Sequence, residues 1–379
     1  MSADRNCVQC LAPLTDVIRS TKRYCSEKCK KRFQRAGKAA ATAQIKHAPL
    51  KAPFPYPGGK SKVADVVWQR FGDVPNYVEG FAGSCAVLLS RPHPPRVETV
   101  NDASGHIANF WRAVTRDPDA VAKAADYPVS EVDLHAVDAW LTGMSESLAE
   151  RLEGDPRFYD TEIAGKWVWG MCVSIAEFCT GHGPWMQVGG KLIKTEGRGG
   201  VYRGRPNISI AGAGIKKSIP FLAGNGKGVN RQSKHGQIGD WMRQLSQRLA
   251  RVRVCCGDWS RVCTPAVTTG LGLTGVFLDP PYGSLAGRDN GIYSQESATV
   301  AYDAQAWCIE HGSNKLLRIA LCGYTGEHET LASHGWSVYH WQAQGGLSNL
   351  GHGKGRENSK KEVIWFSPHC LSDSQMALW

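Results

Sequence analysis

The 379-residue sequence contains no run of about eighteen apolar residues, the length that a membrane-spanning helix needs. Residues 1–6 also lack the apolar core of a secretory signal. From these absences we expect no membrane contact and a cytoplasmic location, where thiols stay reduced. The 13 cysteines should therefore serve as metal ligands or small core residues, and not as a disulfide framework.

The formal net charge of +11 is unevenly distributed along the chain. Residues 1–50 carry 11 Lys and Arg against 3 Asp and Glu, and residues 181–240 carry 10 against 2. Two basic islands on an otherwise mildly acidic chain are typical of a protein that contacts a polyanion. Two solvated surface stretches would have the same composition.

Two pairs of cysteines near the N-terminus are spaced like the ligands of one metal ion: Cys7 and Cys10, then Cys25 and Cys29. Four thiolates can bind a tetrahedral Zn²⁺, and metal binding would stabilise a segment too short to form its own hydrophobic core. Four unrelated cysteines are the alternative. A redox pair is disfavoured because no strand–helix pattern surrounds the first two. Residues 24–35 also resemble short zinc-ribbon modules of prokaryotic proteins.

Residues 276–278 (Val-Phe-Leu) read as a buried strand that runs into Asp279, Pro280, Pro281 and Tyr282. Proline cannot donate to a strand ladder, so the strand must stop at Asp279. In α/β sheets, ligands bind beyond the carboxyl ends of the strands. The Asp-Pro-Pro-Tyr tetrad resembles the active-site motif of amino-methyltransferases, which methylate an exocyclic nitrogen with S-adenosylmethionine.

Three stretches earlier in the chain suggest a nucleotide-type cofactor site. The first is a Pro- and Gly-rich loop that contains Tyr56 and ends at Lys60. In the second, residues 77–89, a strand, a small-residue turn and an apolar helix follow one another, as in the first βα unit of nucleotide-binding folds. In the third, a strand ends at Asp102, where an acid can bind a ribose hydroxyl pair.

Taken in order, Pro-Tyr-Pro-Gly-Gly-Lys, Glu-Gly-Phe-Ala-Gly-Ser-Cys, Val-Asn-Asp and Asp-Pro-Pro-Tyr resemble the motifs of the Dam-type DNA adenine-N6 methyltransferases over residues 52–368. The resemblance implies an α/β fold, a doubly wound Rossmann-like S-adenosylmethionine-dependent methyltransferase with a target-recognition insert. It also implies double-stranded DNA as partner, in a prokaryotic or phage-infected cell, and leaves open a cognate restriction enzyme. The residues implied in cofactor binding are Tyr56, Lys60, Phe81, Gly83, Asp102 and Asp279.

One position departs from the family pattern. The usual Phe-x-Gly-x-Gly of the cofactor turn reads Phe81-Ala82-Gly83-Ser84-Cys85 in this chain. A cysteine is small enough for close packing, but it cannot adopt a positive φ cheaply. We therefore expect the geometry of this turn to differ more than its binding capacity.

The middle of the chain is predicted to combine helices with a basic, glycine-rich stretch. Residues 105–180 read as mostly helical, and residues 181–240 contain 15 glycines and cations such as Arg198, Arg203, Arg205 and Lys234, which suits a surface that follows a phosphate backbone. Trp167, Trp169, Phe178 and Trp185 should be core aromatics. The predicted parts are a zinc-ribbon-like module (1–35), a linker (36–50), a cofactor-binding half (51–120), a recognition insert (121–245) and a catalytic half (246–379).

The resemblance gives the tetrad a chemical role. The lone pair of adenine N6 is delocalised into the ring. Hydrogen bonds from the amino group to the Asp279 carboxylate and the Pro280 carbonyl would make that lone pair available. Tyr282 would stack on a base flipped out of the duplex, and methyl transfer would depend mainly on positioning. This step needs no metal, so the predicted zinc is structural.

Other functions are less consistent with these residues. No Pro-Cys dipeptide occurs in the chain, so the nucleophile of cytosine-C5 methyltransferases has no counterpart. Cytosine-N4 methylation and RNA adenine methylation use the same amino chemistry, but the order of the motifs favours DNA adenine. A zinc-ribbon DNA-binding protein with a degenerate methyltransferase body is disfavoured by the intact Lys60, Asp102 and tetrad.

Overall fold

The computed structural model describes residues 50–56, 58–128, 130–174, 178–179, 185–188, 191–194, 235–281, 299–341 and 362–372. The chain divides into two units, Met1–Pro49 and Leu50–Trp379, and every described residue belongs to the second. Several predicted residues lie outside the described part: Cys7, Cys10, Cys25, Cys29, Arg198, Arg203, Arg205, Lys234 and Tyr282. The five predicted domain ranges remain a prediction.

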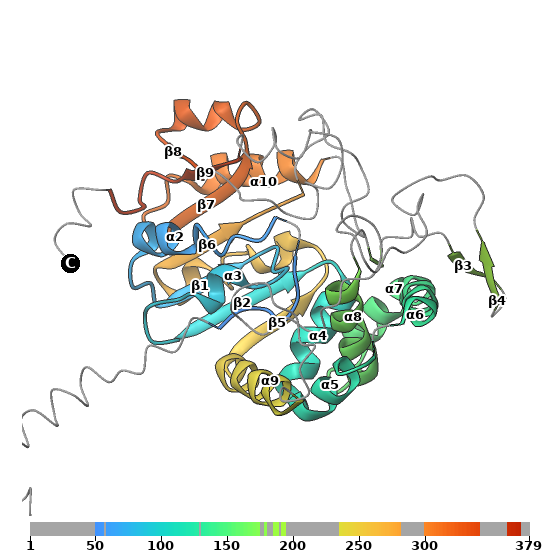
Figure 1. Ribbon diagram of the computed structural model, residues 1–379. Helices are drawn as coiled ribbons and strands as arrows, with labels where there is room; N and C mark the ends of the chain where they lie inside the picture. Colours follow the sequence, from blue (N-terminus) through green and yellow to red (C-terminus); the bar gives the residue numbers. More distant parts are fainter. Residues whose placement is uncertain are drawn as a thin grey trace, which may run out of the picture. The chain divides into compact units, whose positions relative to one another are not determined.

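The described residues form a seven-stranded sheet in the order β5-β2-β1-β6-β7-β9-β8 (Figure 1). The first five strands in this order are parallel, β9 is antiparallel to β7, and β8 is antiparallel to β9. The strands are β1 (Asn76–Glu79), β2 (Val97–Asp102), β5 (Val252–Cys256), β6 (Thr274–Leu278), β7 (Leu317–Tyr324), β8 (Ser337–His340) and β9 (Glu362–Phe366).

This topology confirms the predicted doubly wound α/β fold. From β1 the chain proceeds outward through β2 and β5, and then returns to β6 on the other side of β1. The point between β1 and β6, where the winding direction reverses, is where open α/β sheets bind ligands. Besides the strands before Gly80, Asp102 and Asp279, the sequence indicates strands that begin near residues 251, 316 and 362. All six are confirmed, whereas β8 is additional. The antiparallel β9 completes a mixed sheet.

Helices fill the connections, and the predicted helical stretch after residue 105 is confirmed. Asp117 and Asp160 begin α5 and α8 by accepting hydrogen bonds from backbone N–H groups of the first turn. The helices are α2 (Ala64–Phe71), α3 (Ala86–Leu89), α4 (Gly105–Arg116), α5 (Pro118–Ala125), α6 (Glu131–Gly143), α7 (Ser145–Gly154), α8 (Thr161–Val173), α9 (His235–Leu249) and α10 (Val300–His311). None of the described helices is long and apolar enough to cross a membrane.

Two hydrophobic cores lie on opposite faces of the sheet because side chains alternate along each strand. In β1, Tyr77 packs in the core that includes α2, α4, α5, α8 and α9 (Figure 1), whereas Val78 packs in the core that includes α10. The same alternation separates Phe277 from Val276 in β6. Burial on both faces explains why residues 276–278 of β6 read as a continuous apolar run.

The described residues of the predicted recognition insert include both packed helices and an antiparallel pair of strands. Trp167, Trp169 and Phe178 are buried, which confirms their prediction as core aromatics. Within the glycine-rich basic stretch, the structure describes an antiparallel pair, β3 (Trp185–Val188) and β4 (Lys191–Lys194). The sequence indicated only loops in this stretch.

Candidate functional site

The carboxyl ends of β2, β1 and β6 meet at one edge of the sheet, because these strands are parallel neighbours. β2 ends at Asp102, and β6 ends one residue before Asp279, as the proline after it requires. β9 runs in the opposite direction, so its first residue, Glu362, lies at this same edge. Three acidic residues from distant parts of the sequence are therefore presented at the switch point.

Lys60 lies at the centre of this edge. Its side chain is only 3% exposed, and its Nζ lies 2.8 Å from Asp279 Oδ2 and 3.8 Å from Glu362 Oε2. Nζ also donates to the carbonyl of Gly58 at 2.7 Å. A buried ammonium needs compensating charge, and two carboxylates supply it. The lysine loop and the tetrad, more than 200 residues apart in the sequence, are thus brought together.

The turn between β1 and α3 is held by polar side chains from β2. Asp102 Oδ2 accepts a hydrogen bond from the N–H of Gly83 at 2.8 Å, and its Oδ1 accepts one from Ser104 at 2.9 Å. Asn101 Nδ2 donates to the carbonyls of Gly80 at 3.1 Å and Gly257 at 2.9 Å. These contacts join the turn to the ends of both β2 and β5.

The environment of Asp102 makes its carboxyl group easier to protonate than usual. Burial raises the pKa of Asp102 to about 6, although the N–H groups of Gly83 and Ser104 favour the charged form. Each carboxylate oxygen has a second lone pair beyond the one used by the backbone. Asp102 can therefore hold the turn and still accept hydrogen bonds from a hydroxyl pair of a ligand.

Two aromatic predictions also fall at this edge. The ring of Tyr56 lies against Gly83, so closely that a Cβ at residue 83 would be 2.5 Å from a ring carbon. Phe81 stacks on Trp259, with ring centroids 5.9 Å apart and planes inclined by 27°. Gly83 is thus required for space as well as for its φ of +44°.

Cys85, the residue that departs from the family pattern, adopts the left-handed conformation that we expected it to resist. Its φ is 48° and its ψ 34°, and its side chain is fully buried. Its N–H donates to the carbonyl of Ala82 at 2.6 Å. A cysteine thus adopts a conformation that favours glycine, at the cost of backbone strain.

Some residues of the site had no clear signal in the sequence. Glu79 ends β1 and is buried, accepting hydrogen bonds at Oε2 from Tyr77 Oη at 3.0 Å and from the N–H of Leu88 at 3.2 Å. Burial raises the pKa of Glu79 to about 8. Its position at the end of a strand was a signal that could have identified it. In the sequence, Glu362 directly follows a Gly- and Lys-rich stretch, and this position did not identify it as a residue of the site.

Two further residues, Asp258 and Pro280, follow strands at this edge. In the sequence, Asp258 ends a strand and is expected to lie near the adenine of a bound cofactor. In the structure it is exposed and accepts a hydrogen bond at 2.9 Å from the N–H of Ser260, so it caps the short 3-10 helix Trp259–Val262. This local role accounts for an acid at that position. Pro280 is buried directly after Asp279.

Comparison with known families matches one part of the chain. Residues 56–134 match the family model of the D12 class N6 adenine-specific DNA methyltransferases. The match includes the lysine loop, the turn and Asp102, whereas the tetrad lies outside the matched residues. No curated protein matches the chain.

The family uses S-adenosylmethionine as methyl donor and DNA as substrate, and the residues at the sheet edge fit such a cofactor. Three features of a nucleotide site are present. Gly83 has no room for a Cβ, the ring of Tyr56 lies against it, and the Asp102 carboxylate can accept further hydrogen bonds. In the described part of the chain, no group of three or more His, Cys, Asp or Glu is arranged to hold a metal ion.

Replacing Cys85 measures the strain in the turn. We expect Cys85→Gly to have a free energy of unfolding about 1 kcal/mol higher than Cys85→Ala, because glycine adopts a left-handed φ without the steric penalty of a Cβ. Both variants lack the sulfur atom, so their difference isolates the backbone. Urea unfolding measures it, and an alanine variant as stable as the glycine variant would contradict the assignment.

Proposed function

We propose that this methyltransferase transfers a methyl group to N6 of an adenine that is flipped out of duplex DNA. The observation that carries the proposal is the 2.8 Å ion pair between Lys60 and Asp279. It joins the lysine loop to the start of the Asp-Pro-Pro-Tyr tetrad, at the edge where Asp102 holds the cofactor turn. These two contacts support a cofactor site and a hydrogen-bond acceptor for the adenine amino group at one edge of the sheet.

The cofactor-holding residues in this proposal lie at the carboxyl edge of the sheet: Tyr56, Lys60, Phe81, Gly83, Asp102 and Asp279. The Asp102 carboxylate would accept the ribose hydroxyls, and the Lys60 ammonium would face the carboxylate of the amino-acid part. When bound, S-adenosylmethionine supplies an electrophilic methyl group on its sulfonium. The aromatic rings of Tyr56 and Phe81 would line the site and limit access of water.

Asp279 and Pro280 would act on the adenine. Their oxygens would accept hydrogen bonds from the two amino protons, which favours a pyramidal nitrogen with its lone pair available for attack. The excess proton on N6 would then pass to Asp279 or to water. Lys60 and its second carboxylate partner, Glu362, would hold Asp279 in place. Tyr282, which lies outside the described residues, would stack on the flipped base.

Recognition of duplex DNA is proposed for the basic, glycine-rich stretch 181–240. Its cations suit phosphate contacts, which make affinity dependent on salt. A cognate restriction enzyme remains a possible partner of such a methyltransferase. The predicted zinc module would add to DNA affinity and leave the chemical step unchanged.

The catalytic role of Asp279 is testable by substitution. We expect Asp279→Asn and Asp279→Ala to lower kcat by about a hundredfold or more, because the amino group loses its charged acceptor. N6-methyladenine in plasmid DNA after expression, measured by mass spectrometry, reports the activity. Asp303→Asn, an exposed aspartate in α10, is the matched control and should methylate normally. Undiminished methylation by a folded Asp279 variant would refute the role.

The raised pKa of Asp102 predicts pH dependence of cofactor binding. Above pH about 6 its carboxylate accepts hydroxyl hydrogen bonds, and below this pH protonation removes an acceptor. We expect the Kd for S-adenosylmethionine to rise by up to about tenfold per pH unit as pH falls below 6. Calorimetry at pH 5 to 8 measures this, and Asp102→Asn should bind weakly with no such step. Equal affinity of the wild type at pH 5 and 7 would exclude the role.

The zinc prediction rests on the spacing of Cys7, Cys10, Cys25 and Cys29 and on the resemblance of residues 24–35 to zinc-ribbon modules. We expect one zinc per chain by elemental analysis, and loss of this zinc when Cys7 and Cys10 become serine. Affinity for DNA should fall in that variant while kcat at saturating DNA is retained. Wild-type protein purified without chelators that contains no zinc would disprove the prediction.

A further inference from the structure

The short helix α3 directly follows the cofactor turn and is held by side chains from outside. Its four residues, Ala86–Leu89, are too few to form a stable helix alone. The carbonyl of Val87 accepts a hydrogen bond from Trp68 Nε1 in α2 at 2.7 Å. Neighbouring elements therefore determine where α3 begins and how it is oriented.

Leu88 is held at both of its backbone polar groups. Its N–H donates to Glu79 at 3.2 Å, and its carbonyl accepts from Arg248 Nη2 at 2.9 Å. Glu79 immediately precedes the turn, and Arg248 lies in the last turn of α9. A residue three positions after Cys85 is thus fixed relative to β1 on one side and α9 on the other.

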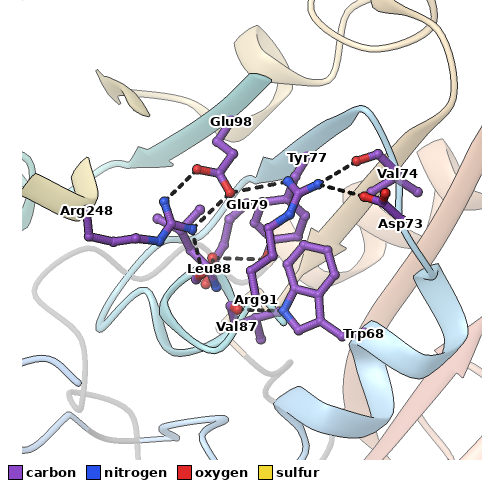
Figure 2. Close-up of polar contacts among 10 residues, drawn as sticks. All are labelled: Trp68, Asp73, Val74, Tyr77, Glu79, Val87, Leu88, Arg91, Glu98 and Arg248. Atoms are coloured by element: carbon purple, nitrogen blue, oxygen red, sulfur yellow. Dashed lines mark hydrogen bonds and ion pairs between the residues drawn. The ribbon is translucent and has the colours of Figure 1, made fainter. Parts of the chain in front are cut away.

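Glu98 in β2 holds Arg248 in this orientation (Figure 2). Arg248 donates to both Glu98 oxygens, at 2.7 and 2.9 Å, in a bidentate pair. Arg91 donates to Glu98 Oε1 at 3.2 Å and to the carbonyl of Val74 at 2.6 Å. The side chains of Arg91 and Glu98 are 0% and 1% exposed, and that of Arg248 is 13% exposed.

Such a buried charge cluster is poorly explained by stability alone. Removing three charges from water is expensive, and apolar side chains of similar volume often stabilise a protein equally well. The bidentate geometry instead fixes the direction in which Arg248 points the second N–H of its Nη2, toward Leu88. The cluster therefore determines a position in the fold, and that position belongs to the helix behind the turn.

The turn needs such a support because of Cys85. A non-glycine residue with a φ of 48° keeps this conformation only when its surroundings impose it. We propose that Arg248 and Glu98 are positioning residues that hold α3, and through it the left-handed turn at Cys85, in the geometry that binds the cofactor. Since α9 is the last helix of the predicted recognition insert, this pair also connects the insert to the cofactor site. The inference rests on the proposed function.

The test uses the full chain with Arg248→Lys, which keeps a cation opposite Glu98 but lacks the guanidinium fork. We expect its Kd for S-adenosylmethionine, measured by calorimetry, to rise about tenfold, equivalent to one lost hydrogen bond to a charged group. Arg248→Met should weaken binding at least as much. Adding Cys85→Gly to Arg248→Lys should restore most of the affinity, because glycine needs no support to adopt the left-handed conformation.

The matched control is Arg243→Met, which removes an exposed ion pair of 2.9 Å between α9 and Asp119 and should bind the cofactor like the wild type. Unchanged affinity in both Arg248 variants would overturn the proposal. Failure of Cys85→Gly to restore binding would also overturn it, because a merely structural role gives no such rescue.

Hydrogen exchange separates this inference from the proposed function, because it needs no cofactor. The amides of Leu88 and Leu89 in α3 should exchange faster in Arg248→Lys than in the wild type. The exchange rates of amides in the sheet should be unchanged. If the wild type shows no affinity for S-adenosylmethionine, the proposed function fails. If the amides of α3 exchange equally in both proteins, the support by Arg248 is refuted whatever binds at the turn.

Discussion

The ammonium group of Lys60 is buried at the edge of the sheet, where it has to be compensated by negative charge. Asp279, at the end of β6, and Glu362, at the start of β9, supply this charge. The requirement draws the loop before α2 across the carboxyl ends of the strands. The same ion pair orients the carboxylate that we propose to bind adenine, so folding and chemistry depend on one interaction.

The cofactor turn depends on a second group of polar contacts. Asn101 and Asp102 form hydrogen bonds with the backbone of the turn. Glu79 and Arg248 form hydrogen bonds with the backbone of Leu88, in the helix that follows the turn. A turn with a left-handed cysteine is strained, and these contacts oppose its relaxation. The turn is therefore held by β1 and β2 together with α9, whose Arg248 lies 150 residues after Glu98 of β2.

Local signals predicted much of this arrangement. A proline after Asp279 stops β6, an acid ends β2 at Asp102, and small residues mark the turn at Gly83; each of these depends on a few neighbouring residues. The partners of Lys60 and Leu88 were not predictable in this way. Arg248 and Glu98 are 150 residues apart, and no periodicity relates them. Even Cys85 was misleading, because its conformation is imposed by its surroundings and not by its own preference.

The sequence by itself determined the doubly wound α/β fold, the strand ends and the order of motifs that resembles the adenine-N6 methyltransferases. These follow from hydrophobic patterning and from backbone restrictions that act over a few residues. Only the tertiary structure decided which charges meet: Lys60 with Asp279 and Glu362, and Glu98 with two arginines. Pairing of buried charges depends on strand order and on the direction of β9, both of which are set by the packing of the whole sheet.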